Sequence, residues 1–115
     1  MTLELTDLEM LGARAVEDFK ASLGQSQEPS QGEVARAAAQ LLAKLEFAYG
    51  LAARLAHREP TVEGTHAIWA TVVTLCDHLA AQLRSPTADD PATRACYDRI
   101  LDFRNAAERR RALHA

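Results

Sequence analysis

The fold is decided by residues 31–58, which read QGEVARAAAQLLAKLEFAYGLAARLAHR. Apolar and small side chains recur there at alternating steps of four and three residues, at positions Val34, Ala38, Leu41, Leu45, Ala48, Ala52 and Leu55. This spacing is typical of a helix that packs against its neighbours at the small crossing angle of a helical bundle. Ser30 and Glu33 have capping-box spacing at the start of this helix. Pro60 ends it, because the residue before a proline avoids the helical region.

Three more helices are predicted around this one. The first begins at Thr6, which has Glu9 at capping-box spacing. The last begins with Asp90 as its cap and Pro91 in its first turn, where the missing N–H of proline costs nothing. The four predicted helices cover about residues 6–23, 31–58, 63–84 and 91–113. Helices of this length joined by short loops favour antiparallel neighbours, so the sequence predicts an all-α, up-down-up-down four-helix bundle.

The composition restricts the class of protein. With 115 residues, 48% hydrophobic residues and a formal net charge of −3, the chain fits one folded domain over residues 1–115 and not a disordered segment. No apolar run approaches the ~20 residues of a membrane span, and the first residues lack the pattern of a signal peptide. We therefore expect a cytoplasmic protein, and two cysteines fit that reducing compartment. Eleven arginines against two lysines suggest a GC-rich bacterial genome.

The long second helix is more apolar than one helix of a monomeric bundle needs to be. Phe47 and Leu51 fall, one turn apart, within the stripe that holds its polar residues, and the small residues Ala43 and Gly50 flank them. An apolar pair between small residues is a better contact patch than scattered apolar residues. The sequence therefore predicts a homodimer through this patch. Cover by residues 25–29 and simple exposure are the alternatives.

Arginines near the end of the sequence form a second feature. Arg104 falls on the inward arc of the last helix, and a buried guanidinium is costly unless an acid pairs with it. Glu46, at the edge of the apolar face of the second helix, is the predicted partner in a buried ion pair. The alternatives are a side chain that reaches out to solvent and a carboxylate of another molecule. Together with Arg109, Arg110 and Arg111, Arg104 makes a candidate surface for an acidic partner.

Charge is uneven along the sequence. Residues 1–33 hold seven acids and two bases, whereas residues 94–111 hold six arginines and three acids. An antiparallel bundle is expected to bring the start of the first helix beside the end of the last. The acids predicted to face Arg109–Arg111 in this way are Glu4, Asp7 and Glu9.

Sequence signals for catalysis or metal binding are weak. Glu63 and His66 have the Glu-x-x-His spacing of a di-metal site in a helical bundle, but such a site needs two copies and the sequence has one. Cys76 and Cys96 fall on inward arcs, where a free cysteine behaves as a small hydrophobe. The sequence also lacks a phosphate-binding glycine loop and a serine elbow. We therefore predict a protein that is not an enzyme and has no metal or cofactor.

Two functions follow from these features. The first is a small interaction module that forms a homodimer and binds another, unidentified protein through exposed helix faces, as regulators, adaptors and secretion chaperones do. The second is a nucleic-acid-binding regulator that uses the C-terminal arginines. A pI near 5.8 and the lack of an aromatic residue between Arg104 and Arg111 count against the second.

Overall fold

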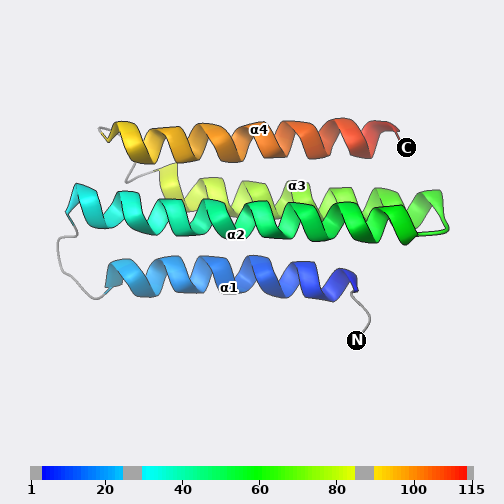
Figure 1. Cartoon of the computed structure of the whole chain (residues 1–115), viewed down its shortest axis with the longest axis horizontal. Helices are drawn as coiled ribbons and strands as arrows, with labels where there is room; N and C mark the ends of the chain where they lie inside the picture. The colour runs from blue at the N-terminus through cyan, green and yellow to red at the C-terminus, as the bar shows by residue number, and fades with distance from the viewer. Residues whose placement is uncertain (1–3, 25–29, 85–89, 114–115) are drawn as a thin grey trace.

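The computed structural model of the chain describes residues 4–24, 30–84 and 90–113. It contains four helices, which are α1 (Leu5–Gly24), α2 (Gln31–Arg58), α3 (Val62–Arg84) and α4 (Pro91–Leu113). Successive helices run in opposite directions along one long axis (Figure 1). The predicted all-α four-helix bundle is confirmed, and every predicted helix end agrees to within one residue.

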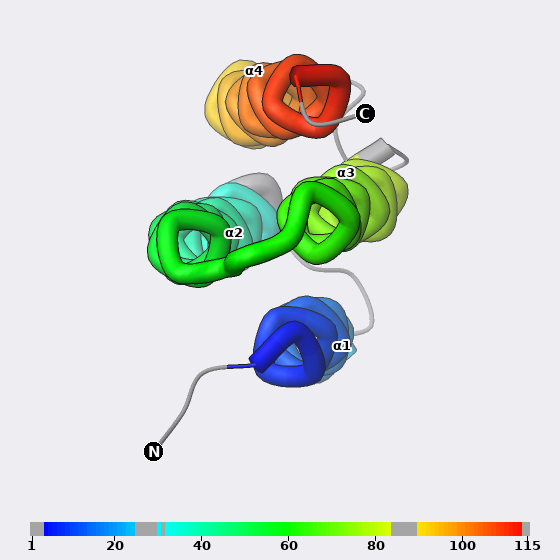
Figure 2. Tube along the Cα trace, turned by 90° about the vertical axis from the view of Figure 1, so that its right-hand side faces the viewer, coloured from blue at the N-terminus to red at the C-terminus, as the bar shows by residue number. Residues whose placement is uncertain are grey.

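The helices form three layers. α2 and α3 lie side by side in the middle, α1 packs on one face of this pair, and α4 packs on the opposite face (Figure 2). Both outer helices contact α2 and α3, whereas α1 and α4 do not contact each other anywhere along their described residues. The Cα atoms extend over 48 × 28 × 15 Å, and the shortest dimension is the depth of the α2–α3 pair.

The starts of α2 and α4 agree with the predicted caps. Ser30 Oγ accepts a hydrogen bond from the N–H of Glu33 at 3.1 Å. Asp90 Oδ1 accepts one from the N–H of Ala92 at 3.3 Å, and Pro91 occupies the first helical position between them. Each cap satisfies a backbone donor that has no partner inside the helix, which is why the helices begin at these residues.

The starts of α1 and α3 use other residues. α1 begins before the predicted cap, because Thr6 is already helical and Asp7 Oδ2 accepts a hydrogen bond from the N–H of Glu4 at 2.7 Å. A carboxylate in the first turn also interacts favourably with the helix dipole. At α3, Thr61 Oγ1 accepts a hydrogen bond from the N–H of Gly64 at 2.9 Å, so the threonine hydroxyl caps this helix.

The core is one apolar cluster whose largest part comes from the middle layer. Trp69 is 1% exposed and is the largest fully buried side chain. α1 adds Leu8, Ala15 and Phe19, and α4 adds Ile100 and Ala107. α2 contacts all three other helices. This position accounts for much of the apolar character of α2 without self-association.

α1 and α3 approach closely at one glycine. A Cβ atom at Gly12 would lie 2.3 Å from Leu75 Cδ1, which is far inside van der Waals contact. Leu75 Cγ would lie at 3.2 Å, so the buried Leu75 side chain would have to shift to make room for a side chain at position 12. Gly12 therefore sets how closely α1 packs on the middle layer.

We expect Gly12→Val to destabilise the protein by about 1–3 kcal/mol, because the branched side chain would overlap Leu75. Valine has a better helix propensity than glycine, so a loss would come from packing. Urea unfolding followed by circular dichroism measures the change. Ala13→Val, at an exposed neighbouring position, is the control and should cost less than about 1 kcal/mol. Equal losses in the two variants would contradict the prediction.

Candidate functional site

One large apolar side chain is exposed near the middle of α2. Phe47 is 61% exposed. The α2 face denotes the exposed residues around it, which are Ala43, Glu46, Phe47, Gly50 and Arg54. A Cβ atom added at Gly50 would meet nothing within 4 Å, so the surface is flat beside the phenyl ring. Three of the four residues predicted for the dimer patch, Ala43, Phe47 and Gly50, are exposed together on this face.

Leu51 does not belong to this surface, and its predicted exposure is wrong. It is 8% exposed and part of the core. Leu51 lies two turns beyond Lys44, whose Nζ donates to Asp18 Oδ2 of α1 at 2.7 Å, so this side of α2 faces α1. The predicted apolar pair is therefore reduced to Phe47. The alternative cover by residues 25–29 falls outside the described residues.

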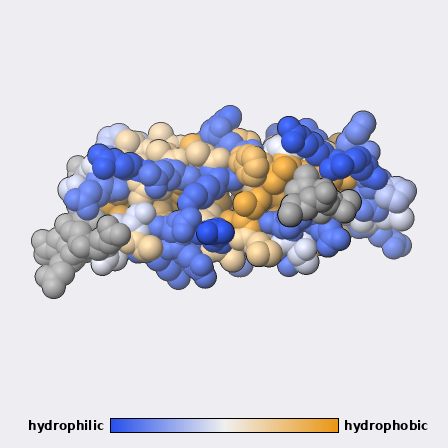
Figure 3. Space-filling model, turned by 60° about the horizontal axis from the view of Figure 1, so that its bottom comes forward, coloured by the Kyte–Doolittle hydropathy of each residue, from blue (hydrophilic) through white to orange (hydrophobic). Residues whose placement is uncertain are grey.

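Exposure alone does not distinguish Phe47. Figure 3 brings the face with α1 forward and shows hydrophobic surface gathered over part of it. Met10 of α1 is 69% exposed, and Val62 and Leu113 are exposed near helix ends. Scattered apolar residues of this kind are normal on a protein surface. The α2 face differs because small side chains, at Ala43 and Gly50, lie on both sides of the aromatic ring.

The predicted ion pair between Arg104 and Glu46 is wrong. Arg104 Nε donates to Asp77 Oδ1 of α3 at 2.6 Å, and this hydrogen bond raises the pKa of the Arg104 guanidinium. The two side chains are 34% and 52% exposed, so the pair is not buried. Arg104 lies on the flank of α4 that faces α3, whereas Glu46 is exposed on α2. A pair this exposed contributes little to stability.

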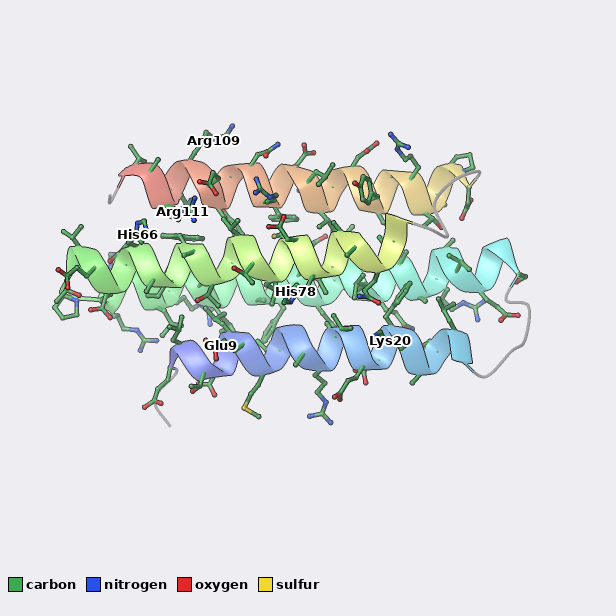
Figure 4. The ribbon with its side chains drawn as sticks, turned by 180° about the vertical axis from the view of Figure 1, so that it is seen from behind. Glu9, Lys20, His66, His78, Arg109 and Arg111 are labelled. Atoms are coloured by element: carbon green, nitrogen blue, oxygen red, sulfur yellow. The ribbon has the colours of Figure 1, made fainter. Side chains whose placement is uncertain are left out.

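The four arginines predicted to bind a partner divide into two groups. Arg111 pairs with Glu108 on the same flank of α4 as Arg104, so both of these arginines already have an acidic partner. Figure 4 shows Arg111 beside His66 of α3 and Arg109 pointing away from the bundle. Arg109 and Arg110 are exposed. Within the described residues, Arg109 and Arg110 are the two of these four arginines that form no ion pair.

Arg110 lies on an aromatic surface that three helices build. Its guanidinium carbon is 4.9 Å from the ring centroid of Trp69 and 5.7 Å from that of Tyr49. Tyr49 in turn lies 5.3 Å from Trp69 and 5.1 Å from Phe103, and Arg99 is 4.8 Å from the centroid of Phe103. We call these five residues the arginine–aromatic cluster. The cluster is not visible in the sequence, because its members come from α2, α3 and α4 and share no spacing in the chain.

The arginine–aromatic cluster borders a hollow of about 370 Å³. Arg99, Arg109, Asp102, Asn105 and the rings of Tyr49 and Phe103 line it. Within residues 4–24, 30–84 and 90–113, no ion pair involves Arg99, Arg109 or Arg110. Cation–π contacts hold two of these guanidinium groups in place against rings. An anionic group in the hollow would therefore meet the guanidinium donors of Arg99 and Arg109 beside the single carboxylate of Asp102.

A larger hollow, of about 760 Å³, follows the groove between α1 and α3. Its floor is apolar and includes Gly12, Val16 and Leu75. Glu9 and His78 belong to its rim, and Figure 4 shows both pointing into the space between the two helices. The groove exists because α4 packs on the far side of the middle layer, so no helix covers the α1–α3 seam there.

The predicted contact between acidic and basic ends of the chain is wrong. Glu4, Asp7 and Glu9 lie at the start of α1, and Arg109–Arg111 lie at the end of α4. These two helices occupy opposite layers and do not contact each other along their described residues. The charge asymmetry along the sequence therefore becomes an asymmetry between two faces of the molecule.

The residues weighed for metal binding do not come together. Glu63 is exposed at the start of α3, and His66 Nδ1 is buried without a hydrogen-bond partner in the described part of the chain. Across that same part, no three histidine, cysteine, aspartate or glutamate side chains are grouped as metal ligands. No described helix combines the length and apolar character that crossing a membrane requires.

Comparisons with known proteins add no further constraint. No protein-family model, no curated protein and no solved structure matches this chain.

The two cysteines are free thiols in different surroundings. Burial, with a smaller contribution from the charge of Asp77, raises the pKa of the Cys76 thiol from 9.0 to about 12. Burial also raises the pKa of Cys96, which is only partly covered. The thiolate is the reactive form of cysteine, so neither residue is activated as a nucleophile.

At neutral pH we expect a disulfide reagent to modify Cys96 first and Cys76 only as the protein unfolds. The physical reason is that Cys76 combines full burial with a raised pKa. Absorbance of the released thiol follows the reaction in the wild type and in Cys96→Ser, which should lose the faster phase. Rapid modification of Cys76 in folded Cys96→Ser would show that the helix packing around it opens readily.

Proposed function

We propose that this protein is a non-enzymatic interaction module of the bacterial cytoplasm that forms a homodimer through the α2 face. The observation that carries this proposal is the exposed phenyl ring of Phe47 between the small residues Ala43 and Gly50. Full burial of an apolar side chain of this size stabilises a complex by about 1.5–3 kcal/mol, and small neighbours let a second helix approach closely. Free cysteines support a reducing compartment.

The second interaction in this proposal involves another protein and takes place on α4. Arg99 and Arg109 line the hollow beside Tyr49, whereas Arg110 packs against the rings of Tyr49 and Trp69. None of the three forms an ion pair with another described residue. Arginines packed against aromatic rings lose little side-chain freedom on binding, because their positions are already restricted. An acidic segment of a partner protein fits this chemistry. Arg104 and Arg111, which already have acidic partners, are left out of it.

We expect Phe47→Glu to convert a wild-type dimer into a monomer, because a carboxylate in place of the buried phenyl ring would lose its hydration without gaining a partner. Light scattering behind size exclusion, at low and high salt, measures the mass. The wild-type dimer should persist at high salt, since burial of apolar surface is not screened. Circular dichroism should show unchanged helicity.

Met10→Glu provides the matched control, because Met10 is as exposed as Phe47 but lies on α1. This variant should keep the wild-type mass. A wild-type protein that is monomeric at every concentration would overturn the proposed dimer. So would a Phe47→Glu protein that remains dimeric.

A nucleic-acid-binding regulator is the second candidate function. The exposed arginines beside Tyr49 and Phe103 favour it, because ligands with phosphate groups use arginine donors. Trp69 does not add to this argument, since it is 1% exposed and cannot stack on a base. The net charge of −3 also opposes an extended phosphate contact.

The salt dependence of oligonucleotide binding tests whether the arginines of α4 bind a nucleic acid or an acidic protein segment. If the arginines bind nucleic acid, the anisotropy of a labelled single-stranded or duplex oligonucleotide should rise with protein and lose affinity steeply between about 50 and 200 mM salt. The triple variant Arg99→Gln, Arg109→Gln, Arg110→Gln should abolish that binding. The triple variant Arg14→Gln, Arg36→Gln, Arg58→Gln removes the same charge elsewhere and should retain it. Absence of binding at low salt eliminates the nucleic-acid function.

A further inference from the structure

We propose that the second copy of this chain binds the α2 face in an antiparallel orientation, with the two α2 helices crossing at Gly50. This inference rests on the proposed homodimer and specifies its geometry. None of the other three described helices lies against the outer side of α2 (Figure 2). A second α2 helix therefore reaches Ala43, Phe47 and Gly50 without displacing α1 or α4.

Gly50 is the first reason for this crossing point. Glycine in a helix interior is destabilising relative to alanine, so its place in the middle of α2 calls for a contact that uses the missing side chain. At Gly12 and Gly64 the contact is internal, because an added Cβ would lie 2.3 Å from Leu75 and Glu59 respectively. At Gly50 nothing lies within 4 Å. None of the described residues uses the space at Gly50, which leaves it open to a second molecule.

The arrangement of side chains around Gly50 is the second reason. At about 100° per residue, Ala43 and Gly50 lie about 20° apart, near the middle of the exposed side of α2. Phe47 and Arg54 fall on one flank of this line, and Glu46 falls on the other. All five side chains are exposed or, for glycine, open to solvent. The face thus has a flat centre, one aromatic side chain and charges of both signs.

Two-fold symmetry about Gly50 matches these side chains to one another. In an antiparallel copy related by a two-fold axis at Gly50, residues at equal distances before and after Gly50 have the same height along the helix axis. With a rise of about 1.5 Å per residue, Glu46 therefore lies at the same height as Arg54 of the second copy. Phe47 stays on one flank of this contact, on the same side as Arg54 of the second copy. Glutamate and arginine side chains are long enough to reach across the narrow centre of a contact built on glycine. Because the contact is isologous, each pairing occurs twice.

Other arrangements of two α2 helices match less well. A parallel copy in register places Glu46 level with Glu46 and Arg54 level with Arg54, so that like charges meet. An antiparallel copy centred between Glu46 and Phe47 sets a carboxylate against a phenyl ring. Like-charge contacts suppress an arrangement and opposite charges fix its register, so charge complementarity selects the crossing at Gly50.

Reversal of the two charges tests the register. Glu46→Arg and Arg54→Glu should each raise the dimer dissociation constant about tenfold, and the double variant should restore it, since the pairs are then re-formed with opposite polarity. Arg36→Glu is the matched control. Arg36 lies five turns before Arg54 on the same side of α2, but its level partner would be residue 64, beyond the end of the second copy's α2. The dimer dissociation constant of the Arg36→Glu variant should therefore equal that of the wild type.

Cysteine cross-linking tests the orientation in a Cys96→Ser background. Gly50→Cys should form a disulfide-linked dimer on mild oxidation, because the two-fold axis brings this position next to itself. Ala43→Cys alone should not, whereas a mixture of Ala43→Cys and His57→Cys proteins should cross-link to each other. Circular dichroism of each variant verifies that the bundle is folded.

The outcomes distinguish this inference from the proposed function. A dimer that Phe47→Glu dissociates, but in which Ala43→Cys cross-links to itself or the charge reversals have no effect, overturns the crossing at Gly50 and leaves the dimer in place. A wild-type protein that is monomeric at all concentrations overturns both. Restoration by the double reversal, together with cross-linking at position 50, establishes the crossing.

Discussion

The α2–α3 pair is the interaction on which the rest of the structure depends, because each outer helix packs only against this pair. Its centre is dense. Ala38, Ala52 and Cys76 have no exposed surface, and the indole of Trp69 is enclosed where α2, α3 and α4 meet. Small side chains let the helix backbones approach, and the dispersion attraction between atoms at that short separation adds to the stabilisation from apolar burial. A change that separates α2 from α3 would therefore remove the surface on which α1 and α4 both rest.

Local chemistry made most of the fold predictable from the sequence. The cap at Ser30 and the Asp90-Pro91 start depend on residues within three positions of each other, so they are visible without knowledge of the tertiary structure. The three-layer arrangement was not predictable in this way. A stripe of apolar residues shows which side of a helix is buried but not which helix covers it. In this bundle α4 packs on α2 and α3 and does not contact α1 along their described residues.

The sequence revealed only part of the candidate site, because a pattern within one helix does not show which other helices lie against it. Phe47 was predicted correctly as an exposed side chain because it departs from the seam of its own helix. Leu51 and Arg104 were placed wrongly because their surroundings depend on other helices. Leu51 belongs to the shared core, and Asp77 of α3 binds Arg104. The arginine–aromatic cluster brings together Tyr49 and Trp69 from separate helices, which is a pattern that no spacing along the chain can show.

The separation of α1 and α4 has a consequence for how the two faces of the molecule influence each other. α1 and α4 share no direct contact along their described residues, so any energetic coupling between these two helices passes through the side-chain packing of α2 and α3. Effects of substitutions at sites without shared partners are usually additive. Substitutions on the outer side of α4 and on the outer side of α1 are therefore expected to have additive effects on stability, unless one of them moves the middle layer. The bundle thus provides two faces that evolution can modify separately.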